Sequence, residues 1–172
     1  RDYKGLDLLL DAWAQLRRAG RTAGRRLIVA GEFYTAREPY LNRIADNELQ
    51  DEVLLHDRFI PDDDVKYYFS AADFVVQPYK TATQSGVTQI AYQFCVPMVV
   101  TAVGGLPEIV PDGRVGYVCS PTAEGVAAAM DRMYEGDALK RFRENCVEER
   151  RRFSWEEMCS RVTELYGLVA PK

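Results

Sequence analysis

Two basic residues at the start of the chain have side chains of the kind that bind phosphate groups. Arg1 and Lys4 stand in the sequence Arg-Asp-Tyr-Lys-Gly, and Gly5 predicts a turn directly before a helix. An arginine guanidinium binds two phosphate oxygens at once, and a lysine ammonium supplies a compact positive charge. Together they could stabilise an anionic group on which negative charge develops. Taken alone, however, two basic residues in a loop are usually solvated.

A second candidate site is the polar loop 81–86, which follows a short apolar segment that ends at Pro78. Its candidate ligand-binding residues are Thr83, Gln84, Ser85 and Gly86. Gly86 would let the backbone approach a phosphate, and a helix that begins here adds free N–H groups and partial positive charge. The same residue types also cap helices that bind no ligand, so the residues alone favour neither role.

A third candidate is a glycine-bearing turn after a buried apolar segment. Gly104 and Gly105 allow close approach of the backbone, and Pro107 suits the first turn of a short helix. Glu108 is either a ligand-binding carboxylate or simply a carboxylate in a helical turn. Two such turns at the carboxyl ends of neighbouring parallel strands would form a ligand crevice.

The elements that must position these residues alternate between helix and strand. Helices are expected over residues 6–18, 38–47, 65–72, 85–95, 122–133, 138–152 and 155–168, and strands over 26–30, 53–56, 73–77, 98–101 and 114–119. This alternation predicts a Rossmann-like three-layer α/β/α sandwich with a mostly parallel sheet. One aspartate of the run Asp62–Asp64 is expected to be the N-cap of the helix that follows.

The composition indicates one ordinary globular domain over residues 1–172. Hydrophobic residues make up 47% and charged residues 28%, and no apolar run has membrane-spanning length. A net charge of −4 leaves no basic stripe, which argues against nucleic acid as a partner. The four cysteines are widely spaced and there is a single histidine, which favours free thiols in a reducing compartment over a metal site.

Three parts of the sequence resemble the donor-binding, C-terminal half of a GT-B glycosyltransferase of family 4, or group 1. They are Arg1-x-x-Lys4-Gly5, Gln84-Ser85-Gly86 and the run from Pro97 to Glu108. The resemblance covers nearly the whole chain. It implies transfer of a sugar from a UDP-sugar or GDP-sugar with retention, in the synthesis of a polysaccharide or glycolipid. It also implies that Arg1 and Lys4 hold the diphosphate and that no divalent cation or other cofactor is required.

The resemblance further implies a nucleobase pocket beside the loop that follows residues 53–56. Phe59 and Ile60 are the candidates for this pocket, although at least one of them is expected to belong to the core. Gly31, at the end of the first strand, would close the other side.

The sequence departs from the family at two positions. Family members carry two glutamates where this chain has Ala82 and Ile90, and Gln89 is the candidate substitute at the ribose. The missing glutamates favour a second hypothesis, a non-catalytic nucleotide-sugar-binding domain with the same fold. The retained Arg1 and Lys4 weigh against it.

The resemblance finally implies a longer protein around this chain. A strand at the centre of the sheet would precede Arg1, and a missing N-terminal half would bind the acceptor. The chain alone is therefore expected to lack transferase activity and to self-associate through exposed strand edges. The full-length protein would be cytoplasmic, with peripheral membrane contact through the missing half.

Overall fold

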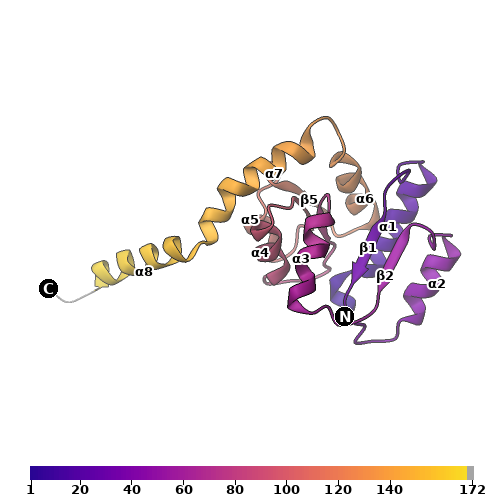
Figure 1. Ribbon diagram of the computed structural model, residues 1–172, viewed down its shortest axis with the longest axis horizontal. Coiled ribbons are helices and arrows are strands. Elements are labelled where there is room, and N and C mark those ends of the chain that lie inside the picture. Colours follow the sequence, from indigo (N-terminus) through magenta and orange to yellow (C-terminus); the bar gives the residue numbers. More distant parts are fainter. Residues whose placement is uncertain (170–172) are drawn as a thin grey trace.

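The computed structural model describes residues 1–169, in which helices and strands alternate along most of the chain (Figure 1). The strands are β1 (Leu27–Ala30), β2 (Val53–His56), β3 (Val75–Gln77), β4 (Met98–Thr101) and β5 (Gly116–Cys119). The helices are α1 (Leu6–Arg18), α2 (Glu38–Asp46), α3 (Asp62–Ala71), α4 (Gly86–Gln93), α5 (Leu106–Ile109), α6 (Ala123–Arg132), α7 (Ala138–Glu149) and α8 (Trp155–Val169). Short 3-10 helices, η1 (Asp2–Lys4) and η2 (Arg150–Phe153), precede α1 and α8.

The strands of the described residues form two separate parallel sheets. β1 pairs with β2, and the other sheet has the order β3-β4-β5. All neighbouring strands are parallel, as the alternation of elements predicts. Within residues 1–169 no hydrogen-bonded ladder joins β1 to β3, so the predicted sheet is divided at this point.

Successive residues of β4 face two different hydrophobic cores. Val99 packs in the cluster built around α1 and α6, whereas Met98 and Val100 pack in a second cluster with residues of α4 and α5. Because successive side chains of a strand point to opposite faces, the two cores lie on opposite sides of the sheet. The predicted three-layer α/β/α arrangement is therefore confirmed.

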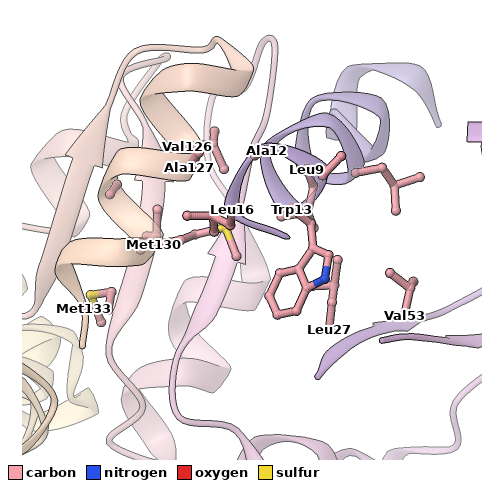
Figure 2. Packing of buried hydrophobic residues seen from close by; sticks show 14 of the residues in the cluster. Leu9, Ala12, Trp13, Leu16, Leu27, Val53, Val126, Ala127, Met130 and Met133 are labelled. Carbon is pink, nitrogen blue, oxygen red and sulfur yellow. The ribbon is translucent and has the colours of Figure 1, made fainter. Parts of the chain in front are cut away.

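Helix α1 holds the two sheets together. Figure 2 shows its Leu9, Trp13 and Leu16 between α6 on one side and Leu27 and Val53, of β1 and β2, on the other. Trp13 is buried, and its indole Nε1–H donates a hydrogen bond to the carboxylate of Glu52, directly before β2, at 2.9 Å. The small sheet is thus anchored by side-chain packing and not by a strand ladder.

The starts of the helices differ in how they are capped. The predicted aspartate N-cap of α3 is wrong, because Pro61 occupies that position and Asp62–Asp64 form the first helical turn. Their carboxylates still lie at the positive end of the helix dipole. Ser85 is the N-cap of α4, and its Oγ accepts a hydrogen bond from the Val87 N–H at 3.3 Å, as is typical of a serine cap.

Helix α8 extends away from the rest of the molecule (Figure 1), and none of its residues is buried. Its large apolar residues recur every three or four positions, at Trp155, Met158, Val162, Leu165 and Val169. In residues 1–169 no helix has both the length and the apolar character needed to cross a membrane.

Candidate functional site

A cavity of about 590 Å³ opens where β1 and β3 end. Arg1 and Lys4 line it from the N-terminal loop, Gly31 from the loop after β1, and Pro78 from the loop after β3. Open α/β sheets bind their ligands at the carboxyl ends of the strands, beside a break in strand order. The cavity therefore lies where the fold favours a ligand, and it contains both of the predicted cations.

Arg1 and Lys4 form no salt bridge with any carboxylate in residues 1–169. The nearby carboxylates of Asp2 and Asp7 are instead bound by Lys80, at 2.8 and 2.9 Å. Hydrogen bonds to Asp2 and then Asp7 raise the pKa of Lys80 above its ordinary value. Lys80 thus binds both nearby carboxylates, and neither of them forms a salt bridge with Arg1 or Lys4. The charges of Arg1 and Lys4 are therefore available to an anionic ligand.

Two glycines bring three loops into direct contact beside this cavity. A Cβ on Gly5 would lie 1.9 Å from the carbonyl oxygen of Pro78, and a Cβ on Gly104 would lie 1.6 Å from that of Ala82. Both glycines have positive φ, at 68° and 51°, which residues with side chains rarely adopt. The loop between β3 and α4 is therefore packed at one end on the Arg1–Gly5 loop and at the other on the loop after β4.

The predicted polar loop and the predicted glycine turn also share a hydrogen bond. The backbone N–H of Gly105 donates to the carbonyl oxygen of Thr83 at 3.1 Å. Gln84 and Gly86 are exposed at the start of α4, on either side of the capping residue Ser85. The residues that the sequence singles out in these two segments therefore form one continuous structure.

A chain of hydrogen bonds connects the cation loop to the start of α4. The Nζ of Lys4 donates to the hydroxyl of Tyr79 at 2.8 Å, and this hydroxyl lies 3.2 Å from Ser85 Oγ. Tyr79 also lines the cavity. The sequence analysis did not identify Tyr79 as a site residue. Its position directly after Pro78, just beyond the end of β3, is the one local feature that points to it.

Aromatic side chains form another wall of the cavity. Phe59 is 65% exposed and Ile60 is half-buried, so the expectation that at least one of them belongs to the core is wrong. Tyr34, which the sequence reasoning missed, is exposed in the same wall, and the Arg1 guanidinium lies 5.0 Å from the centre of its ring. Exposed rings of this kind can stack against a planar ligand.

Several predicted site residues do not line this cavity. Those around the start of α4 and in the turn after β4 are Thr83, Gln84, Ser85, Gly86, Gly104 and Gly105. Two more, Gln89 and Glu108, lie elsewhere. Gln89 lines a separate, open cavity of about 580 Å³ with Arg152 and residues of α8. Glu108 is exposed in the first turn of α5, and its carbonyl oxygen lies 3.4 Å from Arg152. Neither residue lines the cavity that contains Arg1 and Lys4.

The sequence itself matches a known family over most of its length. Residues 1–136 match the family model of the group 1 glycosyl transferases. A D-inositol 3-phosphate glycosyltransferase from Corynebacterium aurimucosum is 28% identical over 171 residues, which cover 96% of this chain and 40% of that protein. The chain thus spans less than half the length of this curated relative.

Solved structures show the same fold. Anabaena HepE, whose structures were determined with UDP and with UDP-glucose, superposes with TM-scores of 0.80 and 0.79 at 20% identity, over 98% of this chain and 46% of HepE. Sucrose-phosphate synthase from Thermosynechococcus elongatus gives a TM-score of 0.76 at 23% identity, over 98% of this chain and 43% of the synthase. The fold is that of the C-terminal half of GT-B glycosyltransferases. From its family match and its fold, this chain belongs to the group 1 glycosyltransferases.

Proposed function

We propose that this chain binds the diphosphate of a UDP-sugar or GDP-sugar and forms the donor half of a glycosyltransferase. The observation that carries the proposal is the pair of cations, Arg1 and Lys4, which have no carboxylate partner in residues 1–169 and line a cavity at the ends of β1 and β3. The N-terminus of α4 adds partial positive charge next to them. The likeness to a fold determined with UDP-glucose adds support.

The proposed reaction transfers the sugar with retention. The acceptor hydroxyl attacks the anomeric carbon from the face on which the diphosphate departs, and the bond from that carbon to the diphosphate oxygen breaks. The acceptor proton passes to the departing oxygen, so this chain needs no side chain as a general base. Arg1 and Lys4 would stabilise the charge of the leaving group, and we propose that they do so without a divalent cation.

Calorimetric titration with UDP, GDP and their common sugar conjugates tests the proposal. We expect one of the two nucleotides to bind, and Lys4→Ala to weaken that binding by about tenfold or more. Lys140→Ala is the matched control, because it removes the same charge from the exposed surface of α7. EDTA should leave the affinity unchanged. A folded chain that binds neither nucleotide would contradict the proposal.

A second candidate function is a non-catalytic nucleotide-sugar-binding domain. It is favoured by Ala82 and Ile90, which stand where the family resemblance predicts glutamates. Both candidates predict nucleotide binding. We propose that this chain is one half of a longer protein, and the two candidates differ in whether that protein transfers a sugar. We propose that the acceptor is bound by the other half of that protein, so the 172-residue chain alone should release no UDP or GDP from a nucleotide sugar in the presence of acceptors. Turnover by this chain would contradict that part of the proposal.

We further propose that the full-length enzyme works in the cytoplasm, in the synthesis of a polysaccharide or glycolipid, with peripheral membrane contact through its other half. All four cysteines of the chain are free, which supports a reducing compartment. We also propose that the isolated chain self-associates through the facing edges of β1 and β3, because exposed strand edges offer unpaired backbone groups.

A further inference from the structure

Tyr79 is a buried residue that contacts the Arg1–Gly5 loop, the start of α4 and the end of β4. Its carbonyl oxygen accepts a hydrogen bond from Thr101 Oγ1, at the end of β4, at 2.6 Å. Its ring packs edge-on against Tyr3, with 6.1 Å between the ring centres, and its hydroxyl lies between Lys4 and Ser85. With only 4% of its surface exposed, the phenol is held at both ends and forms a fixed point in the cavity wall.

Lys4 owes its position to this phenol. A lysine ammonium is carried on a flexible four-carbon stem, and it stays in one place only where contacts hold it. Lys4 Nζ donates to the Tyr79 hydroxyl at 2.8 Å and lies 4.7 Å from the centre of the Tyr79 ring, within the range of a cation–π interaction. Arg1 is held separately, against the ring of Tyr34. Loss of the Tyr79 hydroxyl should therefore leave Lys4 with ring contacts alone, which do not fix the ammonium at one point, and should leave Arg1 in place.

The hydroxyl groups of Tyr79 and Ser85 leave one proton available to a ligand. Ser85 Oγ already accepts the backbone N–H of Val87, and the Tyr79 oxygen already accepts a proton of Lys4. Only one hydroxyl proton can lie between Tyr79 and Ser85, whichever group donates. The remaining hydroxyl proton has no acceptor among residues 1–169. It lies at the N-terminus of α4, where an anion is favoured.

We propose that Tyr79 is a positioning residue for the diphosphate of the nucleotide sugar, a role that rests on the function proposed above. Its hydroxyl holds the ammonium of Lys4 next to the hydroxyl of Ser85, so that one cation and one neutral donor bind the ligand as a unit. The diphosphate then gains from both groups without having to order the lysine side chain itself.

The test is a set of calorimetric titrations of the chain with UDP or GDP and with the corresponding monophosphate, UMP or GMP. Tyr79→Phe should weaken diphosphate binding by about fivefold to tenfold and monophosphate binding by less than about twofold. Because Tyr79 acts through Lys4, the double variant of Tyr79→Phe and Lys4→Ala should bind the diphosphate no more weakly than Lys4→Ala alone.

Tyr92→Phe is the matched control. Tyr92 is also buried, and its hydroxyl donates to the carbonyl oxygen of Ile109 at 2.6 Å, outside the residues that line the cavity. Tyr79→Phe loses the hydrogen bonds with Lys4 and Ser85, and Tyr92→Phe loses the one to Ile109, so both variants should show a fall in Tm. If Tyr79→Phe binds the diphosphate as tightly as Tyr92→Phe while Lys4→Ala is weakened, the positioning role is overturned and the proposed function stands. If the unmodified chain binds neither diphosphate, both are overturned.

Discussion

Gly104 is the residue at which the loops of the site approach most closely. An added Cβ would meet the carbonyl oxygen of Ala82 at 1.6 Å, whereas at Gly113, where φ is 70°, an added Cβ has nothing within 4 Å. Gly113→Ala is therefore expected to cost only the strain of a left-handed backbone, about 1 kcal/mol. Gly104→Ala must also displace the loop, and we expect a total cost of about 3 kcal/mol. Urea unfolding measures the free energy of unfolding of the two variants. Equal losses of stability would show that the loop moves away from the added Cβ of Gly104→Ala at no energetic cost.

Glu149 is a nearly buried carboxylate between two guanidinium groups. Its oxygens lie 2.8 Å from Arg152 and 2.5 Å from Arg114. Hydrogen bonds from Arg152, and then from Arg114, hold the pKa of Glu149 below its usual range against the opposing effect of burial. Because the folded pKa is the lower one, the stabilisation is complete above the ordinary glutamate pKa of about 4.3 and is lost as the pH falls below it.

Glu149→Gln should therefore lower the free energy of unfolding at pH 7 by about 2 kcal/mol, since charged hydrogen bonds are replaced by neutral ones. The loss of stability between about pH 5 and pH 3 should also become less steep than in the unmodified chain. Glu148→Gln is the control, because Glu148 also contacts Arg114 but its side chain is 70% exposed. Denaturant unfolding across this pH range measures both effects, and parallel pH curves for Glu149→Gln and the unmodified chain would contradict the prediction.

At the scale of residues, the sequence predicts what depends on local chemistry and misses what depends on distant contacts. Gly5 and Gly104 are predictable because a glycine directly before a helix, or shortly after a buried strand, indicates a tight loop. Tyr79 is not, because its role comes from a contact with Lys4, which lies 75 residues away in the chain. With ten tyrosines in the sequence, no local pattern identifies the one that is buried beside the cation.

At the scale of elements, helix and strand positions follow from the spacing of apolar residues, while the capping residues depend on backbone angles. An N-cap residue has an extended backbone, and Pro61 has it already, with φ −58° and ψ 148°. The aspartate that follows is therefore the first helical residue and not the cap. The sequence offers several good capping residues here, and only the backbone geometry of Pro61 decides among them.

The exposed helix α8 leads to a prediction about stability. None of its residues is buried, so deletion of residues 155–172 should change the free energy of unfolding by less than about 1 kcal/mol. The shortened chain should also bind less of the dye ANS, because the apolar stripe that begins at Trp155 is removed. Phe142→Ala in α7 is the contrast. Loss of this fully buried ring should lower the free energy of unfolding by about 4 kcal/mol. Denaturant unfolding of the three proteins tests the prediction, and a large loss on deletion would show that α8 packs on the domain.

At the scale of the whole molecule, the sequence predicts parallel strands but not which strands are neighbours. Ile28 of β1 and Val76 of β3 both line a third cavity, of about 490 Å³, that lies between the two sheets. Periodicity marks each strand as buried or half-buried, yet a ladder also requires a partner at hydrogen-bonding distance. That is why the strands and their direction were predictable and the division of the sheet is visible only in the structure.

The divided sheet predicts concentration-dependent association of the isolated chain. Ile28 is 44% exposed beside the open edge of β1, where a strand of another copy can pair. Ile28→Lys should therefore reduce the apparent mass measured by light scattering at high concentration. Val147→Lys, at a 43% exposed position on α7, changes the charge and hydrophobicity in the same way and should have no effect. An unmodified chain that stays monomeric at all concentrations would refute the prediction.

The loop between β3 and α4 is fixed by its backbone and by the side chains of Tyr79, Lys80 and Ser85. The carbonyl oxygens of Pro78, Ala82 and Thr83 meet glycines of neighbouring loops, while the side chains of Thr81, Thr83 and Gln84 are exposed. These three positions can therefore be randomised in a library with little effect on the architecture that holds Lys4 and Ser85. For the proposed donor site, this loop is a natural starting point for laboratory evolution, because its exposed side chains can be varied separately from the residues that hold Lys4.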